Sequence, residues 1–279
     1  MWFRFRMMIL VFAISTGRYR MALADSNTDS GNKYALDSVR EALIRQEDTI
    51  IFSLIERAKF PINCPTYDKS YASNFNSLVE FIVKNTESIQ AKAGRYKNPE
   101  ENPFFPEDLP SSVAPNYPFP QILHPAAALI NINKSIWKMY FDELLPKLVA
   151  SGDDGNYAQT AACDLSSLQA ISRRIHYGKY VAEVKFRGSP QDYEPLIRAQ
   201  FLQDREALMN LLTFETVEET VRKRVEKKAR VFGQEVGPDH EENQGKYKVD
   251  PSVVSLLYEK WVIPLTKLVQ VEYLLRRLD

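Results

Sequence analysis

The sequence is poor in glycine, histidine and cysteine, and each shortage excludes a class of site. It has ten glycines in 279 residues and no glycine-rich phosphate loop, which disfavours a nucleotide-binding fold. The three histidines, at positions 124, 176 and 240, have no metal-ligand spacing. Cys64 and Cys163 imply no disulfide framework, which fits a reducing compartment.

The sequence also lacks an excess of one charge and a long apolar segment. The 36 basic residues balance the 36 acidic ones, so nucleic acid and anionic membranes are not expected partners. The apolar run within residues 1–15 is too short to span a bilayer, and stable membrane insertion is not expected. The length suffices for one large domain or two small ones.

Two interpretations of the amino terminus remain open. The basic start, the apolar run and a later Ala-Leu-Ala sequence resemble a signal peptide. Arg18 and Arg20 are unusual before a cleavage site, which favours an upstream extension with Met21 as the working start. We expect residues 1–33 to be a disordered N-terminal extension and the protein to be cytoplasmic, with the secretory pathway as the alternative.

Apolar residues at spacings of three and four predict helices along most of the remaining chain. No convincing alternating strand and no internal repeat is found, so we expect an all-α, single-domain multi-helix bundle over residues 34–279. Residues 237–248 are expected to form a charged loop. The expected helices are 34–59, 73–96, 133–149, 160–186, 190–201, 203–212, 215–233 and 250–279.

A proline-rich stretch, residues 98–125, separates the second and third of these helices. It should be an irregular connection, because each proline removes a backbone donor and fixes φ. The aromatic residues among the prolines indicate that the connection packs on the body of the protein.

Arg174 and Lys185 are eleven positions apart in the predicted helix 160–186. At ~100° per residue this exceeds three turns by only ~20°, so both lie on one face, ~16 Å apart along the axis. Gly178 and Val181 fall between them and would form a shallow floor on which a small dianion could lie. Taken alone, the spacing is explained more simply by a solvated basic face.

Other polar positions border apolar stripes. Thr266 and Gln270, four residues apart on an apolar helix, are either part of a buried site or satisfied core polar groups. Glu218, near the start of its helix, is either a site carboxylate or a charge favoured by the helix dipole. Arg40 borders the apolar stripe of the first helix, where snorkelling is the usual explanation.

Six long, colinear segments carry a family resemblance: REALIRQEDTIIFSLIERAKF, NPEENPFFPEDLP, GDDGNY, SRRIHYGKYVAEVKF, RVEKKA and IPLTKLVQVEYLLRRLD. With them, the chain from about residue 36 to residue 279 resembles the plant chorismate mutases of the eukaryotic all-helical type. The resemblance implies a homodimeric isomerase that converts chorismate to prephenate by a Claisen rearrangement, in phenylalanine and tyrosine biosynthesis, without a cofactor.

The resemblance also implies roles for the candidate catalytic residues. Arg40 and Arg174 would grip the two carboxylates of the substrate. Lys185 would hydrogen-bond the ether oxygen and one carboxylate. Glu218 would bind the ring hydroxyl, and Thr266 would bind a carboxylate.

Gln270 stands where the fungal relatives carry a glutamate that faces the ether oxygen. A glutamate can donate to that oxygen only when it is protonated, whereas an amide donates at any pH, so we expect a broad neutral pH optimum. The pericyclic reaction needs no nucleophile, metal or base, which suits a sequence that shows none.

Aromatic amino-acid effectors bind at the dimer interface of the regulated relatives. Arg95 and Asn156 are the expected effector contacts here. Ala158 stands where the regulated relatives have glycine, which permits close ligand approach or a positive φ. Gly94 stands where the fungal enzyme has a second arginine. We therefore expect weak or absent feedback.

Two features bear on whether the site is intact. An apparent insertion of three residues, Phe201–Gln203, lies at a helix junction, where an added turn is tolerable, but it precedes Glu218. The alternative function is that of a catalytically inactive homologue that serves as a helical dimerisation partner. Retention of every inferred site residue disfavours this alternative.

Overall fold

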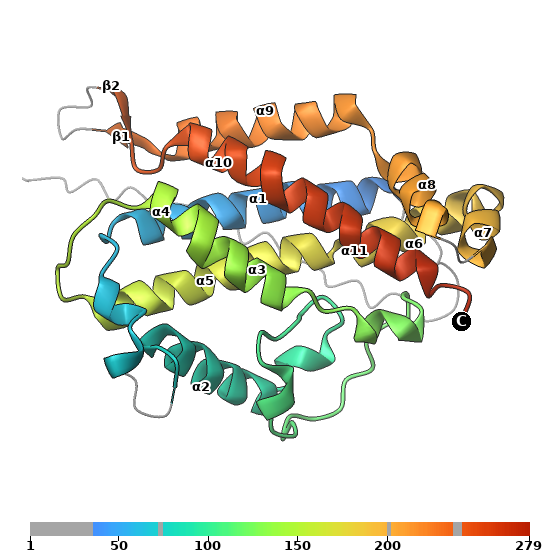
Figure 1. The fold of residues 1–279 in the computed structure, drawn as a ribbon, viewed down its shortest axis with the longest axis horizontal. Helices are drawn as coiled ribbons and strands as arrows, with labels where there is room; N and C mark the ends of the chain where they lie inside the picture. Colours follow the sequence, from blue (N-terminus) through green and yellow to red (C-terminus); the bar gives the residue numbers. More distant parts are fainter. Residues whose placement is uncertain (1–35, 72–74, 200–201, 237–241) are drawn as a thin grey trace, which may run out of the picture. The chain divides into compact units, whose positions relative to one another are not determined.

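A computed structural model describes residues 36–71, 75–199, 202–236 and 242–279, so the predicted extension 1–33 lies outside the described residues. The predicted all-α class is confirmed, and the long helices run alongside one another (Figure 1). The helices are α1 (Leu36–Ala58), α2 (Leu78–Lys92), α3 (Asn133–Met139), α4 (Leu145–Leu148), α5 (Tyr157–His176), α6 (Gly178–Gly188), α7 (Pro190–Ala199), α8 (Leu202–Leu212), α9 (Glu215–Phe232), α10 (Pro251–Leu257) and α11 (Ile263–Leu275).

Helix α1 supplies the centre of the core. Ile50, Ile51 and Leu54 have no exposed surface. The helix packs mainly against α5 and also contacts α6 and α9. Burial of each such side chain contributes about 1.5–3 kcal/mol, so tertiary packing fixes α1 beside the helices that carry the site. Within the described residues, no helix is long and apolar enough to cross a membrane.

A buried ion pair ties the end of α1 to α5. The side chains of Arg57 and Asp164 are both 0% exposed, and Arg57 Nε lies 2.7 Å from Asp164 Oδ1. The hydroxyls of Tyr67 and Tyr140 donate to the same carboxylate at 2.7 and 2.8 Å. Loss of one partner from such a buried pair typically costs about 3–5 kcal/mol, so this contact fixes the two helices relative to each other.

The predicted single helix 160–186 is wrong in one respect, because it consists of α5 and α6 with a turn at Tyr177. Tyr177 keeps right-handed helical dihedrals (φ −61°, ψ −13°). The Val181 N–H still donates to the Tyr177 carbonyl at 3.3 Å. The turn immediately precedes Gly178, and glycine is a poor helix former. The interruption is therefore local, and the chain continues from α5 into α6 without a change of direction.

A π-helical turn interrupts two of the predicted helices, and a proline follows each turn. Helix 133–149 contains the π turn Tyr140–Leu144, and the final helix contains the π turn Tyr258–Val262. Pro146 and Pro264 each lie two positions after the turn. Proline lacks the N–H and its ring clashes with the carbonyl four residues earlier, so the backbone widens ahead of it.

The proline-rich connection packs on the body, as predicted. The Glu87 carboxylate on α2 accepts the backbone N–H groups of Phe104 and Phe105 at 2.7 and 3.0 Å. The Asn133 side-chain amide at the start of α3 donates to the Asn102 carbonyl at 2.8 Å. Side chains from neighbouring helices thus replace the regular backbone bonds that the prolines prevent.

Several predicted boundaries need correction. Helix 73–96 reduces to α2, which Ser77 caps by accepting the Glu80 N–H at 3.1 Å. Helix α5 begins three residues before Thr160, and the final helix ends at Leu275. The prediction of a charged loop without strands is wrong for residues 242–247. These residues form β2 (Glu242–Tyr247), which pairs antiparallel with β1 (Gln234–Val236), a hairpin without an alternating apolar pattern.

Candidate active site

The structure brings five of the six predicted catalytic residues to one cavity of about 160 Å³. The side chains come from α1, α5, α6, α8, α9 and α11, with Phe214 from the connection before α9. Arg174 and Gln270 open into this same cavity. The lining residues are Leu43, Arg174, Val181, Lys185, Leu212, Phe214, Val217, Glu218, Val221, Ile263, Thr266, Lys267 and Gln270.

Arg174 is a buried cation with spare hydrogen-bonding capacity. It is 5% exposed, and its Nη1 donates to Thr266 Oγ1 at 3.3 Å. Among the described residues, its buried Nε has no hydrogen-bond partner. Burial lowers the pKa of Arg174, and the charge of buried Glu47 partly offsets this effect. A guanidinium stays charged in proteins, so the unused N–H is suited to an anionic ligand.

Helix α11 presents Thr266 and Gln270 on the face that packs against α6. The Thr266 hydroxyl donates to the Val262 carbonyl at 2.6 Å while it accepts from Arg174. The buried Oε1 of Gln270 has no partner within the described part of the chain. The unpaired Arg174 Nε can donate to a bound ligand, and the unpaired Gln270 Oε1 can accept from a ligand hydroxyl or a water.

Gly178 does not form the floor that the helical spacing predicts. A Cβ at this position would lie 2.7 Å from the Thr266 carbonyl oxygen and 3.2 Å from its Cγ2. Glycine is present because the α11 backbone crosses α6 in direct contact. Val181 does line the cavity, so only one of the two predicted floor residues faces the site.

Lys185 lies at the other end of the site, close to charges of both signs. Its Nζ lies 4.8 Å from the centre of the Phe214 ring. Burial lowers the pKa of Lys185, the positive charge of Arg40 lowers it further, and Glu218 opposes the shift. The ammonium therefore loses its proton at lower pH than an exposed lysine.

Arg40 is the predicted catalytic residue that does not line the cavity. Its side chain is 61% exposed and its Nη1 pairs with Asp37 Oδ1 at 3.1 Å. Its charge is nevertheless close enough to influence Lys185. To bind a ligand in the cavity, Arg40 would have to exchange Asp37 for a ligand carboxylate.

Lys267 is a site residue that the sequence reasoning missed. Its Nζ lies 2.9 Å from Glu218 Oε1 and donates to Thr213 Oγ1 at 3.1 Å. The inserted Phe201 lies outside the described residues, but Glu218 still lines the cavity. The position of Lys267, directly after Thr266 on α11, was the only available signal.

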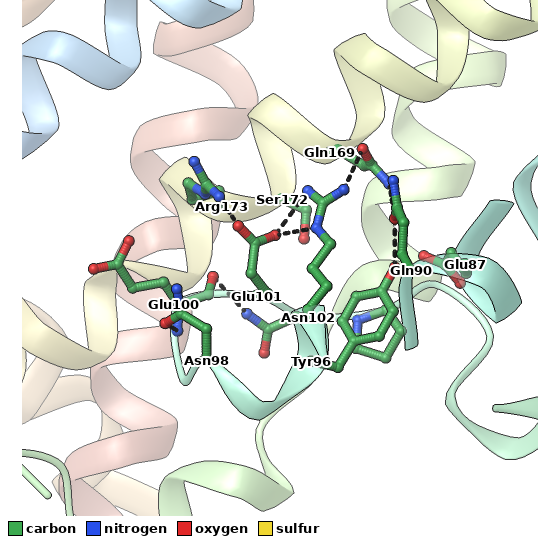
Figure 2. Close-up of polar contacts among 12 residues, drawn as sticks. Glu87, Gln90, Tyr96, Asn98, Glu100, Glu101, Asn102, Gln169, Ser172 and Arg173 are labelled. Atoms are coloured by element: carbon green, nitrogen blue, oxygen red, sulfur yellow. Dashed lines mark hydrogen bonds and ion pairs between the residues drawn. The ribbon is translucent and has the colours of Figure 1, made fainter. Parts of the chain in front are cut away.

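The expected effector contact Arg95 is hydrogen-bonded to residues of the same chain. Its Nε donates to Glu101 Oε2 at 2.9 Å, and its Nη1 donates to Gln169 Oε1 at 2.9 Å. Arg173 pairs with the other oxygen of Glu101. Figure 2 shows Glu101, Arg173 and Gln169 in this network.

Asn156 and Ala158 lie elsewhere, at the start of α5. Both are exposed, and the Asn156 N–H donates to Asp154 Oδ1 at 3.0 Å. Ala158 lies inside the helix, where φ is negative, so the positive-φ explanation for glycine in the regulated relatives does not apply here. Gly94 has φ +87°, and an added Cβ would meet the Ala114 Cβ at 3.2 Å.

The arrangement suits the binding of a small dianion with little covalent chemistry. Guanidinium, ammonium, amide and hydroxyl groups and one carboxylate line the cavity together with apolar side chains. Within the described residues, no group of histidine, cysteine, aspartate and glutamate could hold a metal ion. The site can therefore orient an anionic ligand and stabilise negative charge that develops on it.

Comparison with known proteins agrees with this chemistry. Residues 156–271 match the family model for chorismate mutase type II. The chain is 62% identical to chorismate mutase 2 of Arabidopsis thaliana over 266 residues, which cover 93% of this chain and 99% of that protein. It is 56% identical to the cytosolic chorismate mutase 2 of Zea mays over 251 residues, 89% of this chain and 98% of that one.

A solved structure shares the fold. The crystal structure of AtCM1 with phenylalanine bound in its allosteric site superposes with a TM-score of 0.80 at 54% sequence identity. The match covers 91% of this chain and 100% of that one. The chain therefore belongs to the chorismate mutase family.

Proposed function

We propose that the 160 Å³ cavity is where this enzyme converts chorismate to prephenate. The chain is a chorismate mutase, an isomerase of the shikimate pathway, as its relatives at 54–62% identity are. The observation that supports the location best is the buried Arg174, whose Nε is unpaired and whose neighbours at the cavity are Thr266 and Gln270.

Two arginines hold the substrate in its reactive shape. Arg174 takes one carboxylate through its unpaired N–H, and Arg40 takes the other after releasing Asp37. A guanidinium can bind a carboxylate with two parallel hydrogen bonds. Restraint of both carboxylates selects the diaxial, chair-like conformer in which the reacting carbons meet.

Lys185 and Gln270 stabilise the transition state. In the pericyclic step the ether C–O bond breaks while a C–C bond forms, so negative charge grows on the ether oxygen. Both residues line the cavity, and each can donate to that oxygen. A fixed donor is worth most where charge develops, because it needs no reorganisation during the reaction.

Thr266 and Glu218 complete the binding site in different ways. The Thr266 hydroxyl already donates to the Val262 carbonyl and accepts from Arg174, so it positions the guanidinium. It can donate to a substrate carboxylate only after its hydroxyl rotates. Glu218 accepts the ring hydroxyl of the substrate with its second oxygen, while Lys267 holds the first.

The location is tested by replacing one of two adjacent arginines. We expect Arg174→Met to lower kcat/KM for prephenate formation by about 10²–10³-fold, the effect of losing one donor aimed at substrate charge. The control is Arg173→Met, whose side chain pairs with Glu101 outside the cavity. Equal activity of the two variants would place the reaction elsewhere, and inactive wild-type protein would favour the dimerisation-partner alternative.

The oligomeric state and regulation are part of the proposal. We infer a homodimer, because Arg95 and Asn156 lie far apart in one subunit and could share an effector only across an interface. Crystal structures of AtCM1 hold phenylalanine and tyrosine in its allosteric site. Aromatic amino acids are the corresponding effector class here, with feedback that is weak because Ala158 obstructs close approach.

The cytoplasmic location is also part of the proposal, and it rests on the names of the relatives. The Zea mays relative is named as cytosolic, and we assign this enzyme to the cytoplasm. Imaging of a carboxy-terminal fluorescent fusion with and without residues 1–20 tests this assignment. A secretory pattern that depends on those residues would support the signal-peptide interpretation instead.

A further inference from the structure

A second cavity of the described structure lies away from the site. It measures about 640 Å³ and shares no lining residue with the catalytic cavity. The proline-rich connection forms most of its wall, including Phe119, Leu123 and several prolines, and α6 contributes Lys179. This volume and largely apolar lining are typical of small-molecule sites.

Lys179 is a buried cation in the wall of this cavity. The residue is 3% exposed, and its Nζ donates to Asn102 Oδ1 at 3.0 Å. Lys179 follows Arg174 by five positions, about 140° around the helix axis. The two cations thus project from different sides of the α5–α6 pair, and Lys179 has no part in the proposed catalytic contacts.

Within the described residues, no ion pair neutralises Lys179. Glu101 lines the same cavity, but its carboxylate is taken by Arg95 and Arg173. His176, one turn earlier, is neutral, since burial lowers its pKa to about 3. Burial lowers the pKa of Lys179 to about 8, so most molecules carry an uncompensated ammonium at neutral pH.

We propose that this cavity is a second ligand site, which binds a small carboxylate with an aromatic or alicyclic body and anchors the carboxylate on Lys179. A buried ammonium with one neutral partner gains most from an incoming anion. Asn102 orients the ammonium, and the prolines and aromatic rings contact the apolar body. Arg95, Asn156 and Ala158 do not line the cavity, so it is distinct from the proposed effector site.

The probe is para-fluorophenylacetate, followed by fluorine NMR line broadening on the full chain. We expect millimolar or tighter binding, weakened about tenfold or more in Lys179→Met, the cost of losing one charge-assisted hydrogen bond. The matched control is Lys97→Met, which removes an exposed lysine from the rim of the same cavity. Mutase activity of each variant, expected within about twofold of wild type, reports folding.

The outcomes separate three sources of binding. Persistence of binding in Lys179→Met, or no binding to wild type, would overturn the proposal. Loss of binding in Arg174→Met would assign the probe to the catalytic cavity, and loss of binding in Asn156→Ala would assign it to the effector site, whereas neither residue lines the proposed site. If Lys179→Met is inactive, Lys179→Gln keeps a donor to Asn102 without the charge and should show the same loss of binding.

A pH series gives an independent measurement on the wild type. Affinity should fall about tenfold per pH unit above pH 8, as the ammonium of Lys179 loses its proton. The other titratable groups that face the cavity are Tyr96, Lys97, Glu101 and His124. The decline should vanish in Lys179→Gln and persist in His124→Gln, whereas a decline that persists in Lys179→Gln would overturn the assignment of the anchor.

Discussion

At the scale of single residues, we expect Gln270 and Lys185 to determine the pH dependence of catalysis. An amide donates at every pH, so Gln270 imposes no acid limb. Burial and Arg40 lower the pKa of Lys185, so its proposed hydrogen bond to the ether oxygen should be lost as the pH rises through that pKa. A plot of kcat/KM, which reports the free enzyme, should therefore be flat on the acid side and decline on the alkaline side.

Replacement of Gln270 by glutamate should convert this profile into an acid-dependent one. The carboxyl group can donate only when protonated, so kcat/KM of Gln270→Glu should fall about tenfold per pH unit above its pKa. Stopped assays of prephenate formation from pH 5 to 9 measure this. A flat profile in the variant would show that residue 270 does not donate to the ether oxygen.

Lys267 should act through Glu218 rather than on the reaction itself. Its ion pair and its bond to Thr213 fix the carboxylate, so Lys267→Met should raise KM about tenfold, within the range for a partly buried charged hydrogen bond, and change kcat less. The control is Lys260→Met, which replaces an exposed lysine in the π turn Tyr258–Val262 that precedes α11. A fall in kcat at constant KM would contradict a positioning role, and Lys267→Arg should restore part of the binding.

Single residues were predictable where the family pattern or helical geometry constrains them. The helical spacing placed Arg174 and Lys185 on one face, and the i, i+4 relation placed Thr266 with Gln270. Lys267 could not be found in this way, because a lysine on a helix is normally solvated and only the approach of α9 turns it into a partner of Glu218.

At the scale of elements, the crossing of α6 and α11 determines whether the site assembles. A Cβ on Gly178 would lie 2.7 Å from the Thr266 backbone oxygen, and a backbone atom cannot move aside cheaply. We expect Gly178→Ala to destabilise the protein by about 1–3 kcal/mol through overpacking and to lower kcat/KM, since Thr266 and Gln270 move with α11.

The matched control for this variant lies on the same helix. Gly188 has no atom near an added Cβ, so Gly188→Ala should be neutral or stabilising by up to about 1 kcal/mol from helix propensity. Urea unfolding followed by circular dichroism compares the two. Equal stability of the variants would show that α6 and α11 are not in backbone contact.

The elements themselves were mostly predictable, and the misses have physical causes. Apolar periodicity identifies α1 and α5 because each buries one continuous stripe. It cannot reveal the π turns, which depend on Pro146 and Pro264 within helices that otherwise continue. It also missed the hairpin, because β1 and β2 are short and polar and pair through backbone bonds.

At the scale of the whole molecule, we expect effector binding to need the second subunit of the proposed homodimer. Arg95 is hydrogen-bonded to Gln169, which follows Asn156 by thirteen positions on α5, or ~20 Å. In a symmetric dimer a residue pair that is separated within each chain can meet twice across the axis. The sequence could suggest the contacts by family resemblance, but not their separation, which depends on how the connection after α2 packs.

Ala158 sets the strength of effector binding in this picture. Saturating tryptophan should change the activity of the wild type by less than about twofold, because the methyl group keeps a ligand at a distance. Ala158→Gly should bind phenylalanine measurably by isothermal titration calorimetry. Strong activation of the wild type by tryptophan would contradict the inference of weak feedback.

The shared site can be tested by mixing subunits in the Ala158→Gly background. Arg95→Met and Asn156→Ala should each abolish phenylalanine binding, and light scattering should give the mass of two chains. After subunit exchange, half of the dimers contain one chain of each variant. Each of these mixed dimers keeps one intact site of two. Binding should therefore return to about a quarter of the stoichiometry of the Ala158→Gly protein. A site within one subunit would leave the mixture without binding, because every chain would then carry a damaged site.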